Sequence, residues 1–181
     1  MREKIKDMLE LTNIPNEKIR KERKRTPWDH IFLREAILWS ERSHDAETQC
    51  GCVLVRDKRV ISTGYNGFIS NIVDDCLPNL RNFKYDFMIH AEHNAILNCA
   101  RHGTSTYGSI AYITGPPCNW CLQYMWQAGI VSIVYTNYSQ PKMIESDDSI
   151  RIRNVLIQLM NGDYGYDRMK FTFIPKEKLN D

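Results

Sequence analysis

The 181-residue sequence lacks the marks of a membrane or secreted protein. No apolar run approaches the roughly 20 residues that a membrane-spanning helix needs. The N-terminus opens with charged residues instead of the apolar region of a signal peptide. Internal repeats and low-complexity tracts are also absent. With 43% hydrophobic residues, a chain of this length suits one compact domain, and we expect neither membrane anchoring nor secretion.

An excess of charge of one sign is missing too, because 24 basic residues oppose 22 acidic ones and leave a net charge of +2. Such a balance does not point to a particular class of partner. Six cysteines are sparse for a disulfide scaffold in a chain of this length. They predict reduced thiols or a metal site in a cytoplasmic protein.

One stretch departs from this charge balance. Residues 18–25 read KIRKERKR, in which six basic residues accompany Glu22. We interpret residues 1–26 as a basic N-terminal arm and residues 27–181 as a single domain. The arm is typical of a solvated tail or an exposed helix, and a contact with phosphate or nucleic acid is the alternative.

Apolar periodicity predicts alternating helices and strands after Pro27. Helical spacing is found over 28–43, from His90 to just before Gly103, around Leu122, Met125 and Trp126, and over 149–160. Strands are predicted at 52–55 and 60–63, which form a hairpin, and at 109–114, 131–136 and 170–174. Residues 68–89 have no clear period and read as a long loop, which in compact domains is usually functional. The order implies an α/β sandwich with a largely parallel half.

Two short motifs at predicted helix starts carry the chemistry: His90-Ala91-Glu92 and Pro117-Cys118-Asn119-Trp120-Cys121. Cys118 and Cys121 are three residues apart, so at a helix start they share a face and can bind one metal ion. His90 would be a third ligand, which leaves the fourth tetrahedral position open for water, as in catalytic zinc sites. Helix N-termini favour thiolates. Glu92 lies two residues from His90 and can act as a base outside the ligand set.

Each motif alone has a simpler interpretation. A structural zinc site would need a fourth ligand, for which His93, Cys99 or Cys76 are candidates. A dithiol redox pair is a further alternative, but it leaves His90 and Glu92 unexplained. By default, Cys50, Cys52, Cys76 and Cys99 are small core residues.

Together, the two motifs match the signature of zinc deaminases that act on cytosine or adenine. The wider pattern resembles the deoxycytidylate (dCMP) deaminases, from about Pro27 to Tyr138 and more weakly through the last strand. It comprises Arg42-Ser43, Thr63-Gly64-Tyr65-Asn66-Gly67, His90-Ala91-Glu92-His93-Asn94-Ala95-Ile96 and Gln127-Ala128-Gly129-Ile130. The resemblance implies a three-layer α/β/α sandwich with a mixed sheet of roughly five strands, like that of cytidine deaminases.

The resemblance also implies a reaction. His90, Cys118 and Cys121 would bind one zinc ion per chain. Zinc-bound hydroxide would attack C4 of the cytosine ring, while Glu92 moves the water proton to N3 and then helps protonate the departing ammonia. The chain would thus convert dCMP to dUMP, which feeds thymidylate synthesis.

Substrate and effector residues follow from the same resemblance. Asn66 matches the asparagine that contacts the sugar, and Tyr138 an aromatic residue near the nucleotide. Arg42 with Ser43 is one candidate cradle for the phosphate. Gly64, Tyr65, Asn66 and Gly67 would form the effector site, because the family is commonly hexameric, activated by dCTP and inhibited by dTTP. Some relatives bind a second zinc in the long loop, but this loop offers only Cys76 before His90, so we predict one.

The sequence departs from the family at two places. Cys50-Gly51-Cys52 replaces a valine-glycine-alanine type of sequence, for which we expect differences in packing only. Gly115-Pro116 replaces a threonine-leucine run whose backbone lines the base pocket, so the substrate preference is open to alternatives.

A tRNA adenosine deaminase shares both metal motifs and could use the basic arm on RNA, although residues 65–67 and the long loop favour a free nucleotide. A non-catalytic zinc-binding module of the same fold is the other alternative, against which Glu92 argues.

Overall fold

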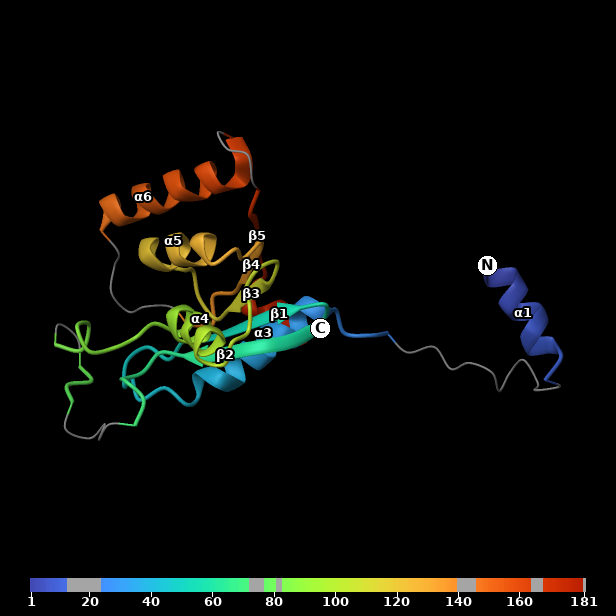
Figure 1. Ribbon diagram of the computed structural model, residues 1–181, viewed down its shortest axis with the longest axis horizontal. Helices are drawn as coiled ribbons and strands as arrows, with labels where there is room; N and C mark the ends of the chain where they lie inside the picture. Colours follow the sequence, from blue (N-terminus) through green and yellow to red (C-terminus); the bar gives the residue numbers. More distant parts are fainter. Residues whose placement is uncertain (13–23, 72–76, 81–82, 140–145, 164–167, 181) are drawn as a thin grey trace.

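The computed structural model describes residues 1–12, 24–71, 77–80, 83–139, 146–163 and 168–180. Its centre is one mixed sheet with the strand order β2-β1-β3-β4-β5 (Figure 1). The strands are β1 Gly51–Arg56, β2 Arg59–Tyr65, β3 Ile110–Ile113, β4 Ser132–Tyr135 and β5 Lys170–Phe173. β1 pairs antiparallel with β2 and β3, whereas the pairs β3–β4 and β4–β5 are parallel. The predicted five-stranded mixed sheet with a parallel half is confirmed.

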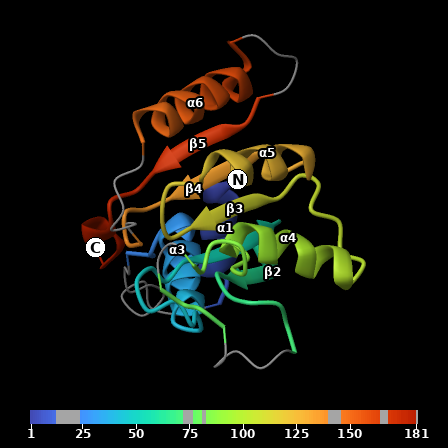
Figure 2. The same ribbon diagram turned by 90° about the vertical axis from the view of Figure 1, so that its left-hand side faces the viewer.

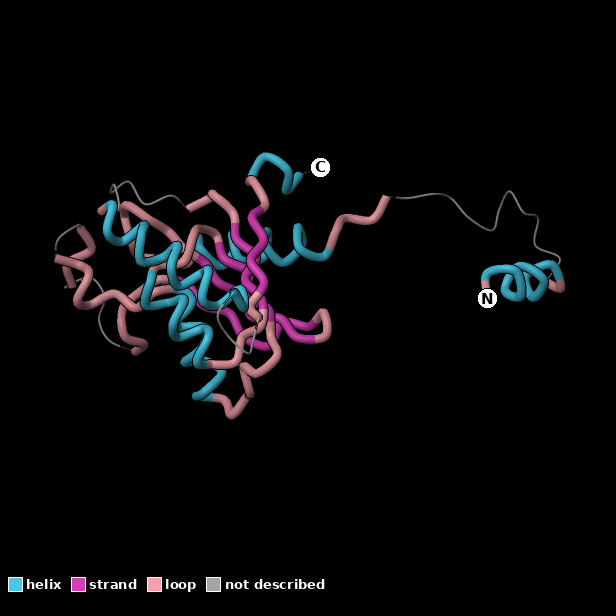
Figure 3. The backbone as a smooth tube through the Cα atoms, turned by 90° about the horizontal axis from the view of Figure 1, so that it is seen from above, coloured by secondary structure: helices cyan, strands magenta, loops and turns pink. Residues whose placement is uncertain are grey.

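Helices cover both faces of this sheet (Figures 2 and 3). The helices are α1 Arg2–Glu10, α3 Trp28–Ser40, α4 Ala91–Arg101, α5 Asn119–Gln127 and α6 Asp147–Gln158, with a π-helical turn Leu159–Asp163 and a 3-10 helix Lys176–Asn180. α3 and the 3-10 helix lie on one face, and α4 and α5 lie on the other. α6 packs against α5, near the edge strand β5. This is the predicted three-layer sandwich.

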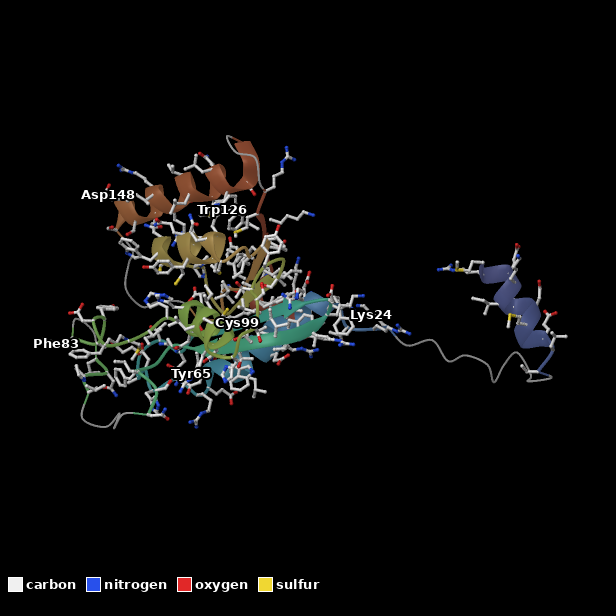
Figure 4. The ribbon with its side chains drawn as sticks, in the orientation of Figure 1. Lys24, Tyr65, Phe83, Cys99, Trp126 and Asp148 are labelled. Atoms are coloured by element: carbon white, nitrogen blue, oxygen red, sulfur yellow. The ribbon has the colours of Figure 1, made fainter. Side chains whose placement is uncertain are left out.

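Two apolar cores separate the three layers. The larger core joins the sheet to α4 and α5, and its fully buried side chains include Leu54, Ala95, Cys99, Leu122 and Met125. The smaller core joins the other face to α3. Cys52 and Cys99 belong to the larger core, as the default interpretation of these cysteines predicts, and Figure 4 places Cys99 where α4 meets the sheet.

Two glycines allow helices to approach the sheet closely. A Cβ atom at Gly51 would lie 1.9 Å from the carbonyl oxygen of Ala36 in α3. A Cβ atom at Gly64 would lie 2.2 Å from the carbonyl oxygen of Ala91 in α4. Any larger residue would push these backbones apart, so the glycines determine how near α3 and α4 lie to the hairpin.

The element boundaries differ from the predicted ones where turns are tight. The helix predicted to reach residue 43 ends at Ser40, because the amides of Arg42 and Ser43 bond to carbonyls three residues back. The hairpin turn contains only Asp57 and Lys58, at φ 52° and 60°, so the strands are longer than predicted. At the N-terminus, Arg2–Glu10 forms an exposed helix, while residues 18–23 of the basic stretch lie outside the described residues. No helix in the described part of the chain is long and apolar enough to cross a membrane.

Candidate active site

The starts of α4 and α5 bring the two sequence motifs together. His90 is the N-cap residue of α4 and Cys118 is the N-cap residue of α5, both with extended backbone. Cys121 follows in the first turn of α5, and its amide donates to the sulfur of Cys118. Because both helices pack on the same face of the sheet, their N-termini meet there. The predicted ligands His90, Cys118 and Cys121 lie within 4.8 Å of one another.

The spacing of these atoms fits a tetrahedral ion. His90 Nδ1 lies 3.5 Å from the sulfur of Cys118 and 3.5 Å from that of Cys121. Zinc bonds of roughly 2.0 Å to nitrogen and 2.3 Å to sulfur, at a tetrahedral angle, separate the two ligand atoms by about 3.5 Å. One imidazole and two sulfurs are also a preferred donor set for zinc. The residues present therefore fit zinc.

A fourth protein ligand does not join this cluster among the described residues. His93 stacks on Tyr124, with ring centroids 4.5 Å apart, and Cys99 is in the core. Cys76, the third candidate, lies outside the described residues. Within the described part of the chain, the three-ligand arrangement leaves one tetrahedral position open, as catalytic zinc sites do.

The two sulfurs and the imidazole shift one another's pKa values. The pKa of Cys118 is lowered to about 4, because Cys121 and His90 both donate to its sulfur. The pKa of His90 is raised to about 9 by its hydrogen bond with Cys118. The pKa of the Cys121 thiol is raised by its hydrogen bond with Cys118 and by burial. The three donor atoms are therefore already gathered at one point, and a divalent cation that binds there would displace the protons of His90 and Cys121.

Glu92 lies beside this cluster in a dry environment. Its side chain is only 6% exposed, and burial raises the pKa of its carboxyl group above the ordinary value. The neighbouring His90 opposes this shift. A carboxyl group whose pKa is raised holds a proton more readily than an ordinary glutamate, which suits a group that accepts and returns a proton. The geometry suits the predicted base.

A pocket of about 250 Å³ opens next to Glu92, near the lower end of the sizes typical of small-molecule sites. Its wall includes two of the three predicted metal ligands, His90 and Cys118, together with Glu92. The remaining lining residues come from several segments: Asp45, Thr48, Cys50, Asn66, Lys84, Tyr85, Met88, Ala91, Ile113, Gly115, Pro116 and Ser139. A small molecule in this pocket would meet both the metal site and the buried carboxyl group.

The other predicted site residues occupy different surroundings. Asn66 lines the pocket and is 6% exposed. Ser43 is buried, and its hydroxyl donates to the Asn66 carbonyl at 2.7 Å. Arg42 is exposed after the end of α3, and Tyr138 is 46% exposed beside the pocket residue Ser139. Neither is among the residues that line the pocket.

The predicted effector segment is tied to its neighbours. Gly64 packs against α4, and the carbonyl of Tyr65 accepts from Asn94 at 2.7 Å. Gly67 forms an isolated β-bridge with Ile89, just before the predicted metal ligand His90.

Sequence reasoning missed several pocket residues. Lys84 and Asp45 form a buried ion pair on the pocket wall, with 2.6 Å between Lys84 Nζ and Asp45 Oδ1. They are 39 residues apart and lie in segments without a clear period, so no local pattern links them. Cys50 also lines the pocket, where burial raises the pKa of its thiol to about 12. Its only sequence signal was the departure from the family's usual valine.

Comparisons with known proteins agree with this geometry. The family model described as the cytidine and deoxycytidylate deaminase zinc-binding region matches residues 26–137. The human deoxycytidylate deaminase is 32% identical over 133 residues, covering 70% of this chain and 72% of the human one. A probable deoxycytidylate deaminase of Drosophila melanogaster is 37% identical over 120 residues, covering 60% of this chain and 58% of its own.

Among solved structures, the dCMP deaminase of the cyanophage S-TIM5 in complex with dCMP and dUMP has the same fold. The TM-score is 0.64 at 22% identity, and the match covers 84% of this chain and all of the phage chain.

Proposed function

Because the chain belongs to the cytidine and deoxycytidylate deaminase family, we propose that it is a zinc-dependent enzyme that hydrolyses dCMP to dUMP and ammonia. The observation that carries this proposal is the juxtaposition of a three-ligand metal site with a buried carboxyl group on the wall of one pocket. The human relative, which is named a deoxycytidylate deaminase, supports the choice of substrate. We further propose that residues 27–181 form the catalytic domain and residues 1–26 a separate arm.

In this proposal, His90, Cys118 and Cys121 hold one zinc ion per chain. Bound zinc would supply an activated water to the pocket. The two thiolates balance the charge of the ion, so the chain's own groups must assist the removal of a proton from water. The N-termini of α4 and α5 contribute partial positive charge at this point.

Glu92 would move the protons of the reaction. Its carboxylate takes a proton from water and delivers it to N3 of the cytosine ring, which makes C4 more electrophilic. The oxygen of the same water forms a bond to C4. Glu92 then takes the remaining proton from this oxygen and delivers it to the amino group as the C4–N bond breaks, so that ammonia leaves and a C4 carbonyl remains. The raised pKa of Glu92 suits both directions of transfer.

The remaining contacts with the nucleotide are assigned by resemblance and position. We propose that Asn66 meets the sugar from the pocket wall. Tyr138 would contact the nucleotide from beside the pocket, and Arg42 with Ser43 would bind the phosphate. Replacing Arg42 with glutamine should then raise KM for dCMP and leave KM for deoxycytidine unchanged.

A substrate panel tests the proposal most directly. The purified full-length protein, with its zinc content measured, is incubated with dCMP, dCTP, cytidine and a tRNA anticodon stem-loop. We expect dCMP to be deaminated. Conversion of the RNA alone would replace this function with adenosine deamination of tRNA, and a zinc-loaded protein without any turnover would favour the non-catalytic module.

Regulation forms part of the same proposal. We propose activation by dCTP and inhibition by dTTP at residues 64–67, because this segment connects to the pocket through Asn66 and to the metal ligand through the Gly67–Ile89 bridge. The rate should be sigmoidal in dCMP without dCTP and steeper with dTTP. Hyperbolic kinetics that ignore both triphosphates would overturn the regulatory part alone.

A homohexamer is the proposed assembly. Large apolar side chains are exposed on α4, α5 and α6, as expected for surfaces that another copy covers: Leu97, Trp120, Tyr124, Ile152 and Val155. Sedimentation or light scattering would measure the assembly. We also propose a cytoplasmic location, because a site that depends on free thiolates suits a reducing compartment.

A further inference from the structure

A buried ammonium group holds one wall of the pocket together. Lys84 is 3% exposed, and its Nζ donates to Asp45 Oδ1 at 2.6 Å, to Asp45 Oδ2 at 2.7 Å and to Glu47 Oε2 at 3.2 Å. An ammonium group has three N–H donors. In this arrangement these donors are directed at Asp45 and Glu47, so the ammonium group is bound to the turn at residues 45–47.

The Asp45 carboxylate that binds Lys84 also holds the turn that follows Asp45. Its Oδ1 accepts from the amides of Glu47 and Thr48 at 2.8 and 2.9 Å. Its own amide donates to the hydroxyl of Ser43 at 3.2 Å. These hydrogen bonds fix the conformation of residues 43–48. Lys84 balances the charge of the Asp45 carboxylate, which is buried away from water.

Asn66 is the next member of this network, and it faces the pocket. Its Nδ2 donates to Asp45 Oδ2 at 3.2 Å and to the Thr48 carbonyl at 2.8 Å, while its Oδ1 accepts from the amide of Cys50 at 2.7 Å. These partners fix which end of the amide is nitrogen, since a backbone amide only donates and a carbonyl only accepts. One lone pair of Oδ1 is left for a ligand hydroxyl.

Lys84 belongs to a segment with few apolar contacts of its own. The aromatic side chains on either side of it are substantially exposed, namely Phe83, Tyr85 and Phe87 at 71%, 47% and 46%. Figure 4 shows Phe83 at the outer end of this segment, away from the sheet. The ion pair with Asp45 is therefore a principal link between the segment before α4 and the turn at residues 43–48.

We propose that Lys84 is a positioning residue for the substrate: through Asp45 it orients Asn66 and the 43–50 wall, against which the sugar of the nucleotide binds. This role rests on the proposed dCMP deaminase function. Lys84 lies outside the zinc ligands and Glu92, so its effect falls on substrate binding. Removing the ammonium group leaves two carboxylates facing each other, which drives the turn away from its present geometry.

The test compares five full-length proteins: the wild type, Lys84→Met, Asp45→Asn, the double variant, and Lys178→Met as the same substitution at an exposed lysine. In Lys84→Met we expect KM for dCMP to rise by about tenfold or more, with kcat within about threefold of wild type and zinc per chain unchanged. The dissociation constant of the product dUMP should rise by the same factor. Asp45→Asn should also raise KM for dCMP with little change in kcat. In the double variant, the increase in KM should be smaller than the product of the increases in the two single variants.

The outcomes separate this role from the proposed function. An unchanged KM in Lys84→Met, or a fall in kcat at constant KM, would overturn the role while the deaminase function stands. Loss of zinc or of folding in both single variants would show that the cluster only supports the fold, and would overturn it too. A zinc-loaded wild-type protein that leaves dCMP unchanged would overturn the proposed function, and this role with it.

Discussion

Replacing Gly64 with alanine separates two roles for the glycine at the end of β2. The resemblance places Gly64 in an effector site, whereas the structure packs it against α4. An added Cβ would lie 2.2 Å from the Ala91 carbonyl oxygen and 2.5 Å from the Ala95 amide nitrogen, where ordinary contact begins near 3.4 Å. Both neighbours are backbone atoms, so no change of rotamer relieves the clash.

The expected magnitude follows from these distances. β2 and α4 must move apart by roughly 1 Å, and overpacking of this kind costs about 1–3 kcal/mol. For a protein of this size, each kcal/mol lowers the melting temperature by roughly 2–4 °C. The start of α4 carries His90 and Glu92, and a displacement of about 1 Å at reacting groups can cost 10²-fold in rate. We therefore expect Gly64→Ala to melt several degrees lower and to lose about 100-fold in kcat/KM for dCMP.

Gly67→Ala is the matched control within the same segment. A Cβ at this position would meet only carbon atoms of the Tyr65 ring, at 3.4 and 3.6 Å, and this side chain can rotate. We expect its stability to stay within about 0.5 kcal/mol of wild type. Thermal unfolding and dCMP turnover without effectors measure both variants. A Gly64→Ala protein with wild-type stability and basal rate, but without a response to dCTP, would refute the packing argument and favour an effector contact.

Two further predictions test other parts of the molecule. Glu92→Ala should retain zinc and fold yet lose turnover by several orders of magnitude, and wild-type activity in this variant would remove Glu92 from the mechanism. Burial, together with its hydrogen bond to Asp29 at 2.8 Å, raises the pKa of the Tyr112 hydroxyl. The protonated phenol makes this bond, so its contribution of about 1 kcal/mol is present below pH 10 and is lost as the pH rises through the raised pKa. Tyr112→Phe should therefore be less stable than wild type at pH 8, and a difference that does not shrink in alkali would contradict this assignment.

The fold could be predicted largely because its signals are local. The apolar faces around Leu122 and Met125 and the short β-branched runs at 109–114 and 131–136 each define an element from neighbouring residues. The predicted boundaries of helices and strands are wrong where hydrogen bonding or backbone conformation in a turn, and not apolar periodicity, determines where an element ends. Ser40 donates its hydroxyl to the Ile37 carbonyl, and the chain then continues in a tighter turn, so α3 stops before residue 43. Asp57 and Lys58 adopt positive φ values without a glycine to announce the two-residue turn.

The residues of the candidate site could likewise be predicted only where their sequence signals are local. The cluster of potential metal ligands could be predicted because Cys118 and Cys121 share one helical turn and His90 begins the motif upstream of them, so their spacing suggests their chemistry. The Lys84–Asp45 pair could not be found in this way. Neither residue lies in a periodic element, and a charged side chain in a loop is ordinarily solvated. Only the tertiary fold makes these two residues partners.

The Gly-Tyr-Asn-Gly segment shows why a motif match does not assign a role to each of its residues. Gly64 allows the close packing of α4, and the Asn66 amide group donates both hydrogens to residues around the pocket. Gly67 pairs with Ile89, directly before the proposed metal ligand His90. Tyr65 is the remaining residue of the segment. Its side chain is half-buried and takes no part in the packing of α4, the pocket-wall hydrogen bonds of Asn66 or the Gly67–Ile89 bridge. An effector that binds here must therefore contact Tyr65 or displace the Gly67–Ile89 bridge, and the second route would move His90 itself.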